Sequence, residues 1–244
     1  MTIKYVAFDL DDTLFNGTLL VEKARRASIE MMLEYGLNVD PDYAYHTLQK
    51  IVKQFGSNNQ SHFDNLLVRL ENDPEVEIGD INNNKLVTAG IIGYHREKVK
   101  HFKLFRDVKK AFKMLRKRGI EIAIITDGIP KKQWEKILRL KLDTMVDIIL
   151  ISDEESVRKP DKFLFELLLH RIKCEPEEVI YVGDRIDKDV APAHKVGINT
   201  VLIHRGTKHD MYVSDVDFNV EVEPDFHAND LYILTDIVEE LNTQ

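Results

Sequence analysis

The fold is decided by residues 3–15, which read IKYVAFDLDDTLF. The first six residues, Ile3 to Phe8, form a short apolar run of the kind that makes a buried strand. Three carboxylates follow at once, at Asp9, Asp11 and Asp12. In open α/β sheets ligands bind beyond the carboxyl ends of strands. The stretch therefore predicts a strand, then a loop that carries acidic side chains at a ligand-binding edge.

Strand-like runs of the same kind recur in the rest of the chain. They lie at residues 120–126, 148–152, 179–183 and 198–204. Helix-like segments lie between and after them, at residues 108–118, 132–140, 161–171 and 189–195. Strands that alternate with helices predict a parallel sheet covered on both faces. The expected fold class is therefore α/β.

One region interrupts this alternation. From about residue 16 to about residue 100 the apolar spacing is helical and no convincing strand occurs. The expected helices lie at residues 19–35, 43–54, 62–70 and 84–99. We therefore expect two domains, a core made of residues 1–15 and 101–244 and an inserted all-helical domain at 16–100.

Composition narrows the class of function. The chain has 244 residues, with 34 Lys and Arg against 42 Asp and Glu, and a net charge of −8. This balance argues against broad binding to nucleic acid and means that an anionic substrate needs locally placed cations. The single cysteine, Cys174, fits a reducing compartment. No apolar run spans a membrane and residues 1–10 do not resemble a signal peptide, so we expect a cytoplasmic protein without a membrane partner. The oligomeric state stays open.

Asp9 and Asp11 are the first candidate catalytic pair. Phosphoryl transfer through a covalent aspartyl-phosphate needs one carboxylate as the nucleophile. It also needs a proton donor for the leaving alkoxide, which later activates water. Asp9 and Asp11 could divide these roles. An isolated pair of this kind is more often a solvated acidic turn, so the interpretation depends on the rest of the sequence.

Two further groups suit the binding of phosphate. Thr126, Asp127 and Gly128 directly follow an expected strand. A threonine hydroxyl and backbone N–H groups in a turn that contains glycine suit a phosphate oxygen. Lys159 precedes Pro160 at the start of an expected helix, and a fixed ammonium can offset the charge of a phosphoryl group. Taken alone, the first group reads as a strand-ending turn and the lysine as a surface charge.

Asp184 and Asp189 follow the expected strand at residues 179–183. Magnesium is typically bound by one or two protein carboxylates together with water and phosphate. Asp184 could join Asp9 in holding such an ion, and Asp189 is placed to orient Lys159 or a metal-bound water. Acidic residues at a helix N-terminus are the alternative explanation, which accounts better for Asp189 than for Asp184.

Taken together and in order, these segments resemble a known family. FDLDDTLF, ITDG, RKPDKFLF and YVGDRIDKD are similar to the four signature motifs of the haloacid dehalogenase superfamily. The inserted helices resemble the C1-type cap of that family. The resemblance implies a Rossmann-like core and a mobile cap that closes over substrate. It also implies a magnesium ion (Mg2+) held by Asp9, the backbone carbonyl of Asp11, and Asp184.

The resemblance also implies a role for each matching residue. Asp9 corresponds to the nucleophile, Asp11 to the general acid/base, and Thr126 and Lys159 to phosphate binders. Asp189 corresponds to a partner of Lys159 or of a metal-bound water. Dehalogenases of the superfamily carry an aromatic residue where this chain has Asp11, so the resemblance favours phosphate esters over haloacids. Asp12 departs from the glycine of many relatives, and we expect its side chain to point away from the phosphate.

Selectivity is expected to come from the helical domain. The segment FGSNNQSHFDNLLVRL, at residues 55–70, resembles an archaeal subgroup with glyceraldehyde 3-phosphate phosphatase activity. Asn58 and His62 in this segment are candidate substrate-binding residues, because asparagine and histidine can bond substrate hydroxyls or a carbonyl. The alternative is that they are solvated turn residues.

The expected function is magnesium-dependent hydrolysis of a small phosphate monoester. The expected partner is accordingly a small phosphorylated metabolite. A phosphomutase and a nucleotidase of the same superfamily are the alternatives within the family. A non-catalytic phosphate-binding module fits less well, because it predicts a missing nucleophile or lysine.

Overall fold

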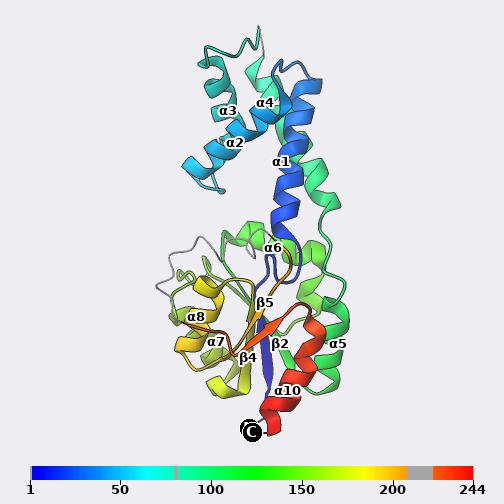
Figure 1. Cartoon of the computed structure of the whole chain (residues 1–244), viewed down its shortest axis with the longest axis vertical. Coiled ribbons are helices and arrows are strands. Elements are labelled where there is room, and N and C mark those ends of the chain that lie inside the picture. The colour runs from blue at the N-terminus through cyan, green and yellow to red at the C-terminus, as the bar shows by residue number, and fades with distance from the viewer. Residues whose placement is uncertain (1, 80–81, 208–221, 244) are drawn as a thin grey trace. The chain divides into compact units, whose positions relative to one another are not determined.

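The computed structural model describes residues 2–79, 82–207 and 222–243, and the chain divides into two compact units (Figure 1). The core unit consists of Met1–Thr18 and Phe102–Gln244, and the helical unit consists of Leu19–His101. Each unit has its own hydrophobic core, so each is described separately.

The core unit is built on one parallel sheet. Its described strands are β1 (Tyr5–Phe8), β2 (Glu121–Thr126), β3 (Ile148–Ile151), β4 (Val179–Gly183), β5 (Asn199–Ile203) and β6 (Phe226–Ala228). Their order is β3-β2-β1-β4-β5-β6, and every pair is parallel. This is the strand order of a Rossmann-type sheet. The predicted α/β fold with a Rossmann-like core is therefore confirmed.

Helices cover both faces of this sheet (Figure 1). α5 (Val108–Lys117) and α10 (Leu234–Thr243) lie on one side, and α7 (Phe163–Ile172) and α8 (Ala191–Lys195) lie on the other. Alternate residues of a strand face opposite sides, so β1 contributes to both layers. Phe8 packs against Phe112 of α5 with ring centroids 5.1 Å apart, whereas Ala7 belongs to the buried cluster that contains Phe165 of α7.

The strand order places the ends of β1 and β4 side by side. Phe8 lies opposite Val182 of β4 on one side and opposite Ile124 of β2 on the other. From β1 the chain adds β2 and β3 on one side, and it then adds β4, β5 and β6 on the other side. The strand order thus reverses between β1 and β4, and open α/β sheets bind ligands at such a position. Residues that follow β1, β2 and β4 are therefore brought to one edge.

The remaining elements of the core unit are short, apart from α6 (Pro130–Leu140). They are the 3-10 helices η1 (Leu142–Thr144), η2 (Pro176–Glu178) and η5 (Leu231–Ile233), and the π-helical turn η3 (Ile186–Val190). The helix expected at residues 189–195 thus begins earlier, as the π-helical turn, and becomes α-helical at Ala191. The sequence analysis also missed β6, since three residues give no readable alternation.

The helical unit contains four described α-helices. They are α1 (Gly17–Glu34), whose first two residues belong to the core unit, α2 (Pro41–Phe55), α3 (His62–Glu71) and α4 (Asn83–Lys100). Side chains of Asp40 and Asn82 accept backbone N–H groups at the starts of α2 and α4, which are stabilising helix caps. At Gly93 an added Cβ would lie 2.4 Å from the carbonyl oxygen of Ala27, so α4 packs directly against α1.

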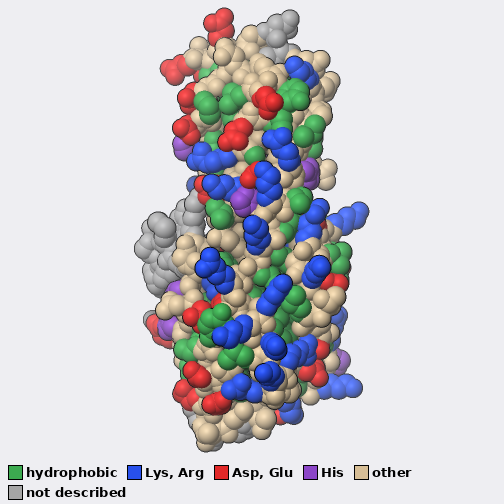
Figure 2. Space-filling model, turned by 90° about the vertical axis from the view of Figure 1, so that its right-hand side faces the viewer, with side chains coloured by type: hydrophobic (Ala, Val, Ile, Leu, Met, Phe, Trp, Pro, Cys, Tyr) green, Lys and Arg blue, Asp and Glu red, His purple; other side chains and the backbone are tan. Residues whose placement is uncertain are grey.

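Basic side chains gather on one face of the core unit. Figure 2 shows many lysine and arginine side chains on the side where α5 lies. Exposed basic side chains of α5 are Lys109, Lys110, Lys113, Arg116 and Lys117. In the described part of the chain, no helix combines the length and apolar character needed to cross a membrane.

Candidate active site

Asp9 is the first residue after β1 and lies almost fully buried at the sheet edge. Its backbone N–H donates to the carbonyl oxygen of Val182 at 2.9 Å, so the main chain still runs parallel to β4 at this point. Its carboxylate Oδ1 lies 2.6 Å from the ammonium Nζ of Lys159. Lys159 is 150 positions away in sequence, and the fold brings these two predicted site residues into direct contact.

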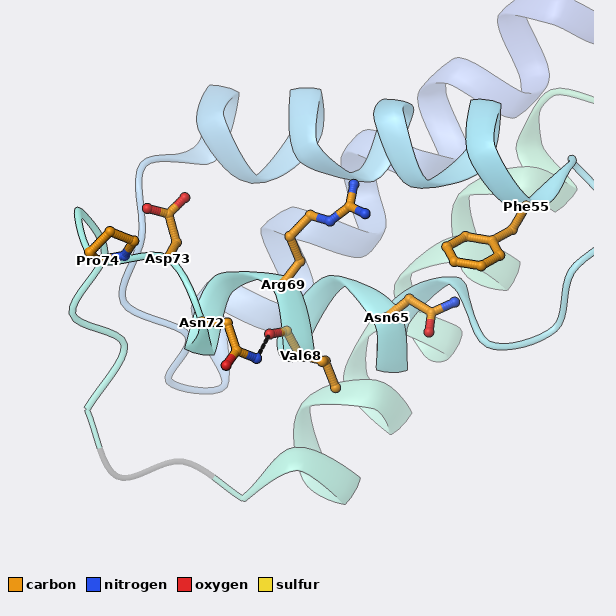
Figure 3. Close-up of a pocket in the computed structure, with 7 residues that line it drawn as sticks. All are labelled: Phe55, Asn65, Val68, Arg69, Asn72, Asp73 and Pro74. Carbon is orange, nitrogen blue, oxygen red and sulfur yellow. Dashed lines mark hydrogen bonds between the residues drawn. The ribbon is translucent and has the colours of Figure 1, made fainter.

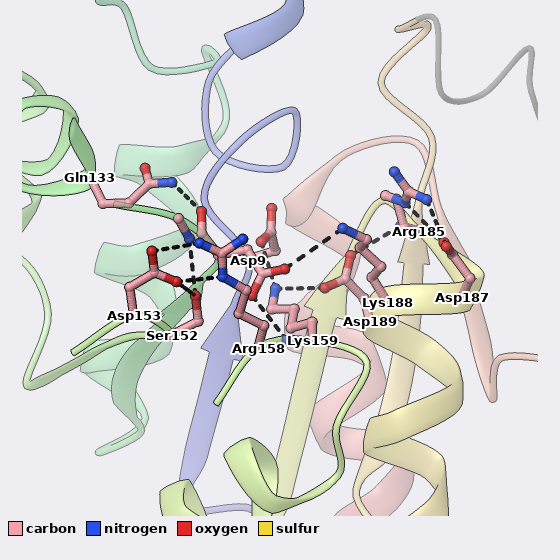
Figure 4. A network of polar contacts seen from close by, with 12 residues as sticks. Asp9, Gln133, Ser152, Asp153, Arg158, Lys159, Arg185, Asp187, Lys188 and Asp189 are labelled. Atoms are coloured by element: carbon pink, nitrogen blue, oxygen red, sulfur yellow. Dashed lines mark hydrogen bonds and ion pairs between the residues drawn. The ribbon is translucent and has the colours of Figure 1, made fainter. Parts of the chain in front are cut away.

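Lys159 is held by three hydrogen bonds. Its Nζ donates to Asp9 Oδ1 at 2.6 Å and to Asp189 Oδ1 at 2.7 Å, both of which Figure 4 shows. It also donates to the hydroxyl oxygen of Tyr181 at 2.7 Å. An ammonium group has three N–H donors, so these contacts account for all of them. Burial alone would lower the pKa of Lys159, but the carboxylates of Asp189 and Asp9 outweigh burial and hold that pKa well above its usual value. The lysine is therefore a fixed cation beside Asp9.

Asp189 is fixed in turn by its surroundings. Its Oδ1 accepts from Lys159 and from the Tyr181 hydroxyl, the latter at 3.0 Å, and its Oδ2 accepts the backbone N–H of Arg185 at 3.1 Å. The absence of a side chain at Gly183 makes this placement possible, since an added Cβ would lie 2.4 Å from both Cβ and Cγ of Asp189. These contacts fit the role of a lysine partner.

Asp9, Asp184 and Asp189 form a buried acidic cluster. One carboxylate oxygen from each lies within 4.8 Å of the other two. Burial raises the pKa of Asp184 to about 9, and the neighbouring carboxylates of Asp9 and Asp189 add to this rise. Burial also raises the pKa of Asp9 to about 7, against the opposing effect of Lys159. Buried oxygen ligands with more negative charge than Lys159 can neutralise suit a hard divalent cation, and the set fits a metal site of this kind.

Asp11 points to a different partner. Its Oδ2 accepts from Nζ of Lys136, on α6, at 2.5 Å. The neighbouring Asp12 has a positive φ of 59°, and its carboxylate accepts the backbone N–H of Thr18 at 3.0 Å and the Thr18 hydroxyl at 2.5 Å. Asp12 therefore anchors the turn that leads into α1, while Asp11 is held by α6.

The segment after β2 forms a second wall of the site. Thr126 is the last residue of β2 and is buried. Asp127 Oδ1 accepts the backbone N–H of Lys159 at 3.0 Å, so it holds the loop that carries the lysine. Gly128 has a φ of 132°, which favours glycine, and its N–H donates to Ser152 Oγ at 3.0 Å. All three residues lie next to the Asp9 cluster in the fold, and their contact with phosphate stays a prediction.

Asn58 and His62 lie in the helical unit, not in the cluster around Asp9. Nε2 of His62 lies 2.9 Å from the carbonyl oxygen of Gly56, and the side-chain oxygen of Asn59 accepts the N–H of Ser61 at 2.7 Å. These contacts order the connection between α2 and α3. Whether Asn58 and His62 bind substrate is not tested by them and stays a prediction.

A pocket of about 500 Å³ also lies in the helical unit (Figure 3). It is lined by Phe55 of α2, by residues of α3 such as Val68 and Arg69, and by the turn at Asp73 and Pro74. None of the four motif segments contributes to this lining. All the residues that line this pocket thus belong to the helical unit.

Two site residues were missed by the sequence analysis. Tyr181 sits inside the strand-like run VIYVG, where an aromatic side chain reads as core, although its hydroxyl bonds both Lys159 and Asp189. A buried tyrosine hydroxyl needs a polar partner, and that was the available signal. Lys136 lies in a helix rich in basic residues, and nothing in its local sequence separates it from its neighbours.

The class of protein to which this fold and site belong is given by comparison with known families. The model of the haloacid dehalogenase-like hydrolase family matches residues 6–203, and the chain belongs to this family. The resemblance drawn from the four motifs is thus confirmed.

Relatives with assigned names are similar over almost the whole chain. The glyceraldehyde 3-phosphate phosphatase of Methanopyrus kandleri is 40% identical over 241 residues, which covers 98% of each chain. That of Pyrococcus furiosus is 40% identical over 240 residues, covering 98% of this chain and 95% of the relative. The solved HAD phosphatase of Thermococcus onnurineus has a TM-score of 0.63 at 22% identity, and covers 97% of this chain and 98% of that one.

Proposed function

We propose that this chain hydrolyses small phosphate monoesters, with glyceraldehyde 3-phosphate as its preferred substrate. The observation that carries the proposal is the contact between Asp9 and Lys159 at the switch point of the sheet, where a carboxylate is paired with a fixed cation. Phosphatase relatives at about 40% identity over the whole chain support the substrate.

The first half of the proposed reaction transfers the phosphoryl group to the enzyme. A carboxylate oxygen of Asp9 attacks phosphorus and forms an aspartyl-phosphate as the bond from phosphorus to the ester oxygen breaks. The leaving alkoxide takes a proton from Asp11. The products of this step are the free alcohol, the phosphorylated Asp9 and ionised Asp11.

The second half releases inorganic phosphate. Asp11 takes a proton from a water molecule, and that water attacks the phosphorus of the aspartyl-phosphate. The bond between phosphorus and the Asp9 oxygen breaks, so that Asp9 is again a free carboxylate and Asp11 is again protonated. The two residues therefore complete a cycle without any other proton carrier.

Charge on the transferring group is offset by residues around Asp9. Lys159 supplies a fixed ammonium, and we propose that Thr126, Asp127 and Gly128 frame the phosphate oxygens, with the Gly128 turn presenting backbone N–H groups. Magnesium would be held by Asp9, the Asp11 carbonyl and Asp184, and when bound it would supply further positive charge at the phosphoryl group. Asp189 acts in this scheme by holding Lys159, and the hydrogen bond between them supports this role.

A substrate panel tests this function. The purified chain is assayed for phosphate release from glyceraldehyde 3-phosphate, other triose and sugar phosphates, sugar-acid phosphates and nucleoside monophosphates, with magnesium and with a chelator. We expect turnover of small esters that stops on chelation and returns with magnesium. If no member of the panel releases phosphate, the proposal is refuted. Transfer of the phosphoryl group to a sugar would identify a phosphomutase, and preference for nucleoside monophosphates a nucleotidase.

A further inference from the structure

Lys136 lies outside the four motif segments and contacts the proposed general acid. Its Nζ lies 2.5 Å from Oδ2 of Asp11, and the two residues are 125 positions apart in sequence. The lysine side chain is 18% exposed and the Asp11 side chain 36% exposed, so the pair is partly shielded from solvent. A partly shielded ion pair restrains its members more than a fully exposed pair does.

The other oxygen of Asp11 is confined as well. A Cβ added at Gly17 would lie 2.5 Å from Oδ1 of Asp11, so the carboxylate packs closely against the backbone of this glycine. The main chain between these residues is also restrained, because the N–H of Asp12 donates to the carbonyl of Phe15 at 2.9 Å. The Asp11 carboxylate therefore lies between Gly17 on one side and Lys136 on the other.

α6 holds Lys136 in a defined position. Ile137 and Leu140 are buried, and Gln133 donates from its side chain to the carbonyl oxygen of Asp127. Gln133 and Lys136 are three residues apart and so share one face of the helix. The face that carries Lys136 is thus tied directly to the loop after β2 (Figure 4 shows Gln133).

We propose that Lys136 is a positioning residue for Asp11: its ammonium donates to Oδ2, and this holds the carboxyl group so that its other oxygen can carry the proton that passes to the leaving oxygen. The inference rests on the proposed function. A general acid must reach the proton acceptor within hydrogen-bond distance, and small displacements of such groups lower rates strongly. Among the described residues, Lys136 is the one side chain that hydrogen-bonds the Asp11 carboxylate. Loss of that bond leaves the carboxylate confined on the Gly17 side alone, and therefore less firmly placed.

Two other roles for Lys136 lead to different results. If Lys136 binds the substrate, its replacement raises KM for every ester, whether or not Asp11 is present. If Lys136 forms a surface ion pair and nothing more, its replacement changes neither kcat nor KM, because such pairs contribute little. A positioning residue affects the proton transfer, so its effect grows with the basicity of the leaving oxygen.

The first experiment compares Lys136→Met with Lys131→Met. Lys131 is an exposed lysine on the same helix, and its replacement makes the same change of charge. kcat and KM are measured for a series of alkyl and aryl phosphates. For Lys136→Met we expect kcat to fall about tenfold to a hundredfold on alkyl esters and about twofold or less on aryl esters, with KM almost unchanged. Lys131→Met should match the wild type, and Lys136→Arg should recover part of the loss.

The second experiment repeats Lys136→Met in an Asp11→Asn background. If Lys136 acts through Asp11, the double variant is no slower than Asp11→Asn alone, because coupled residues are not additive. A further loss in the double variant, or an equal loss on alkyl and aryl esters, overturns the inference. An unchanged alkyl rate in Lys136→Met also overturns it. Melting temperatures verify folding, and Lys136→Gln replaces the methionine variant if that variant is unstable.

The two proposals fail in different ways. A wild-type chain that hydrolyses no phosphate ester refutes the proposed function itself. An active wild type whose Asp11→Asn variant loses alkyl-ester activity while Lys136→Met retains it refutes the positioning role of Lys136 and leaves the proposed function intact.

Discussion

At the scale of single residues, the site is defined by an excess of buried negative charge. Asp9, Asp184 and Asp189 share one ammonium, that of Lys159, and burial makes each uncompensated carboxylate unfavourable. The protein retains this arrangement although it opposes folding, which is common where a charge serves a function. The same burial raises the pKa values of Asp9 and Asp184.

The pH dependence of stability follows from Asp184. Its pKa in the folded protein is about 9, above the value of about 4 for an unfolded aspartate. Between these values the folded state binds a proton that the unfolded state has lost, so the free energy of unfolding of the metal-free protein decreases as pH rises from about 4 to about 9. Asp184→Asn removes this contribution and should flatten the decrease, as measured by denaturant unfolding in chelator.

Magnesium provides the matching control. A bound divalent cation replaces the proton, so it should stabilise the wild type most at high pH and stabilise Asp184→Asn much less. If wild type and Asp184→Asn lose stability in parallel across this pH range, Asp184 does not carry the buried charge assigned to it.

Site residues could be predicted from the sequence where a carboxylate or an ammonium lies at the end of an expected strand or the start of an expected helix. Asp9, Asp184 and Asp189 are predicted because each follows an expected strand, and Lys159 because it precedes an expected helix. The fold brings these four side chains together. Tyr181 and Lys136 could not be found in this way. Their partners lie 8 and 22 positions away for Tyr181 and 125 positions away for Lys136, so only the packed structure reveals the contacts.

At the scale of secondary-structure elements, the apolar runs predicted the strands well. β1, β2, β3, β4 and β5 all fall within the predicted ranges, because strands buried on both faces read as continuous apolar segments. The least predictable element is the π-helical turn Ile186–Val190. The turn contains Asp189, whose side chain is held by Lys159 and Tyr181, and such tertiary contacts have no periodic signature in the sequence.

Gly183 links β4 to this turn and should not tolerate a side chain. An added Cβ would lie 2.4 Å from Asp189, whose side chain is fixed by Lys159 and Tyr181. Gly183→Ala should therefore push the turn away from the strand, lower the free energy of unfolding by about 1–3 kcal/mol and reduce kcat through the displaced lysine. Denaturant unfolding and steady-state kinetics measure the two effects. Full activity at unchanged stability would show that the turn adapts without moving Asp189.

At the scale of the whole molecule, two units divide the proposed work. The acidic edge and its lysine belong entirely to the core unit. In the proposed function these groups bind only the phosphoryl part of a substrate. Discrimination between esters needs groups that meet the rest of the substrate. We propose that the helical unit supplies them, and that Asn58 and His62 are among them.

This division predicts a selective effect of mutations in the helical unit. Asn58→Ala and His62→Ala should lower kcat/KM for the best natural substrate, because a site built to bond substrate groups loses them. Hydrolysis of p-nitrophenyl phosphate, which lacks such groups, should be spared. Melting temperatures verify folding, since His62 also contacts the carbonyl of Gly56. Equal effects on both substrates, or none, would place the selectivity elsewhere.

The central claim is that the Asp9 carboxylate receives the phosphoryl group. The most direct measurement is acid quenching of a single turnover with a radiolabelled phosphate ester, followed by mass spectrometry of the peptide that contains Asp9. We predict a labelled phosphoryl group on Asp9 in the wild type, and neither label nor turnover in a folded Asp9→Asn variant. Substantial phosphate release by Asp9→Asn, or a label on a different residue, would contradict the account.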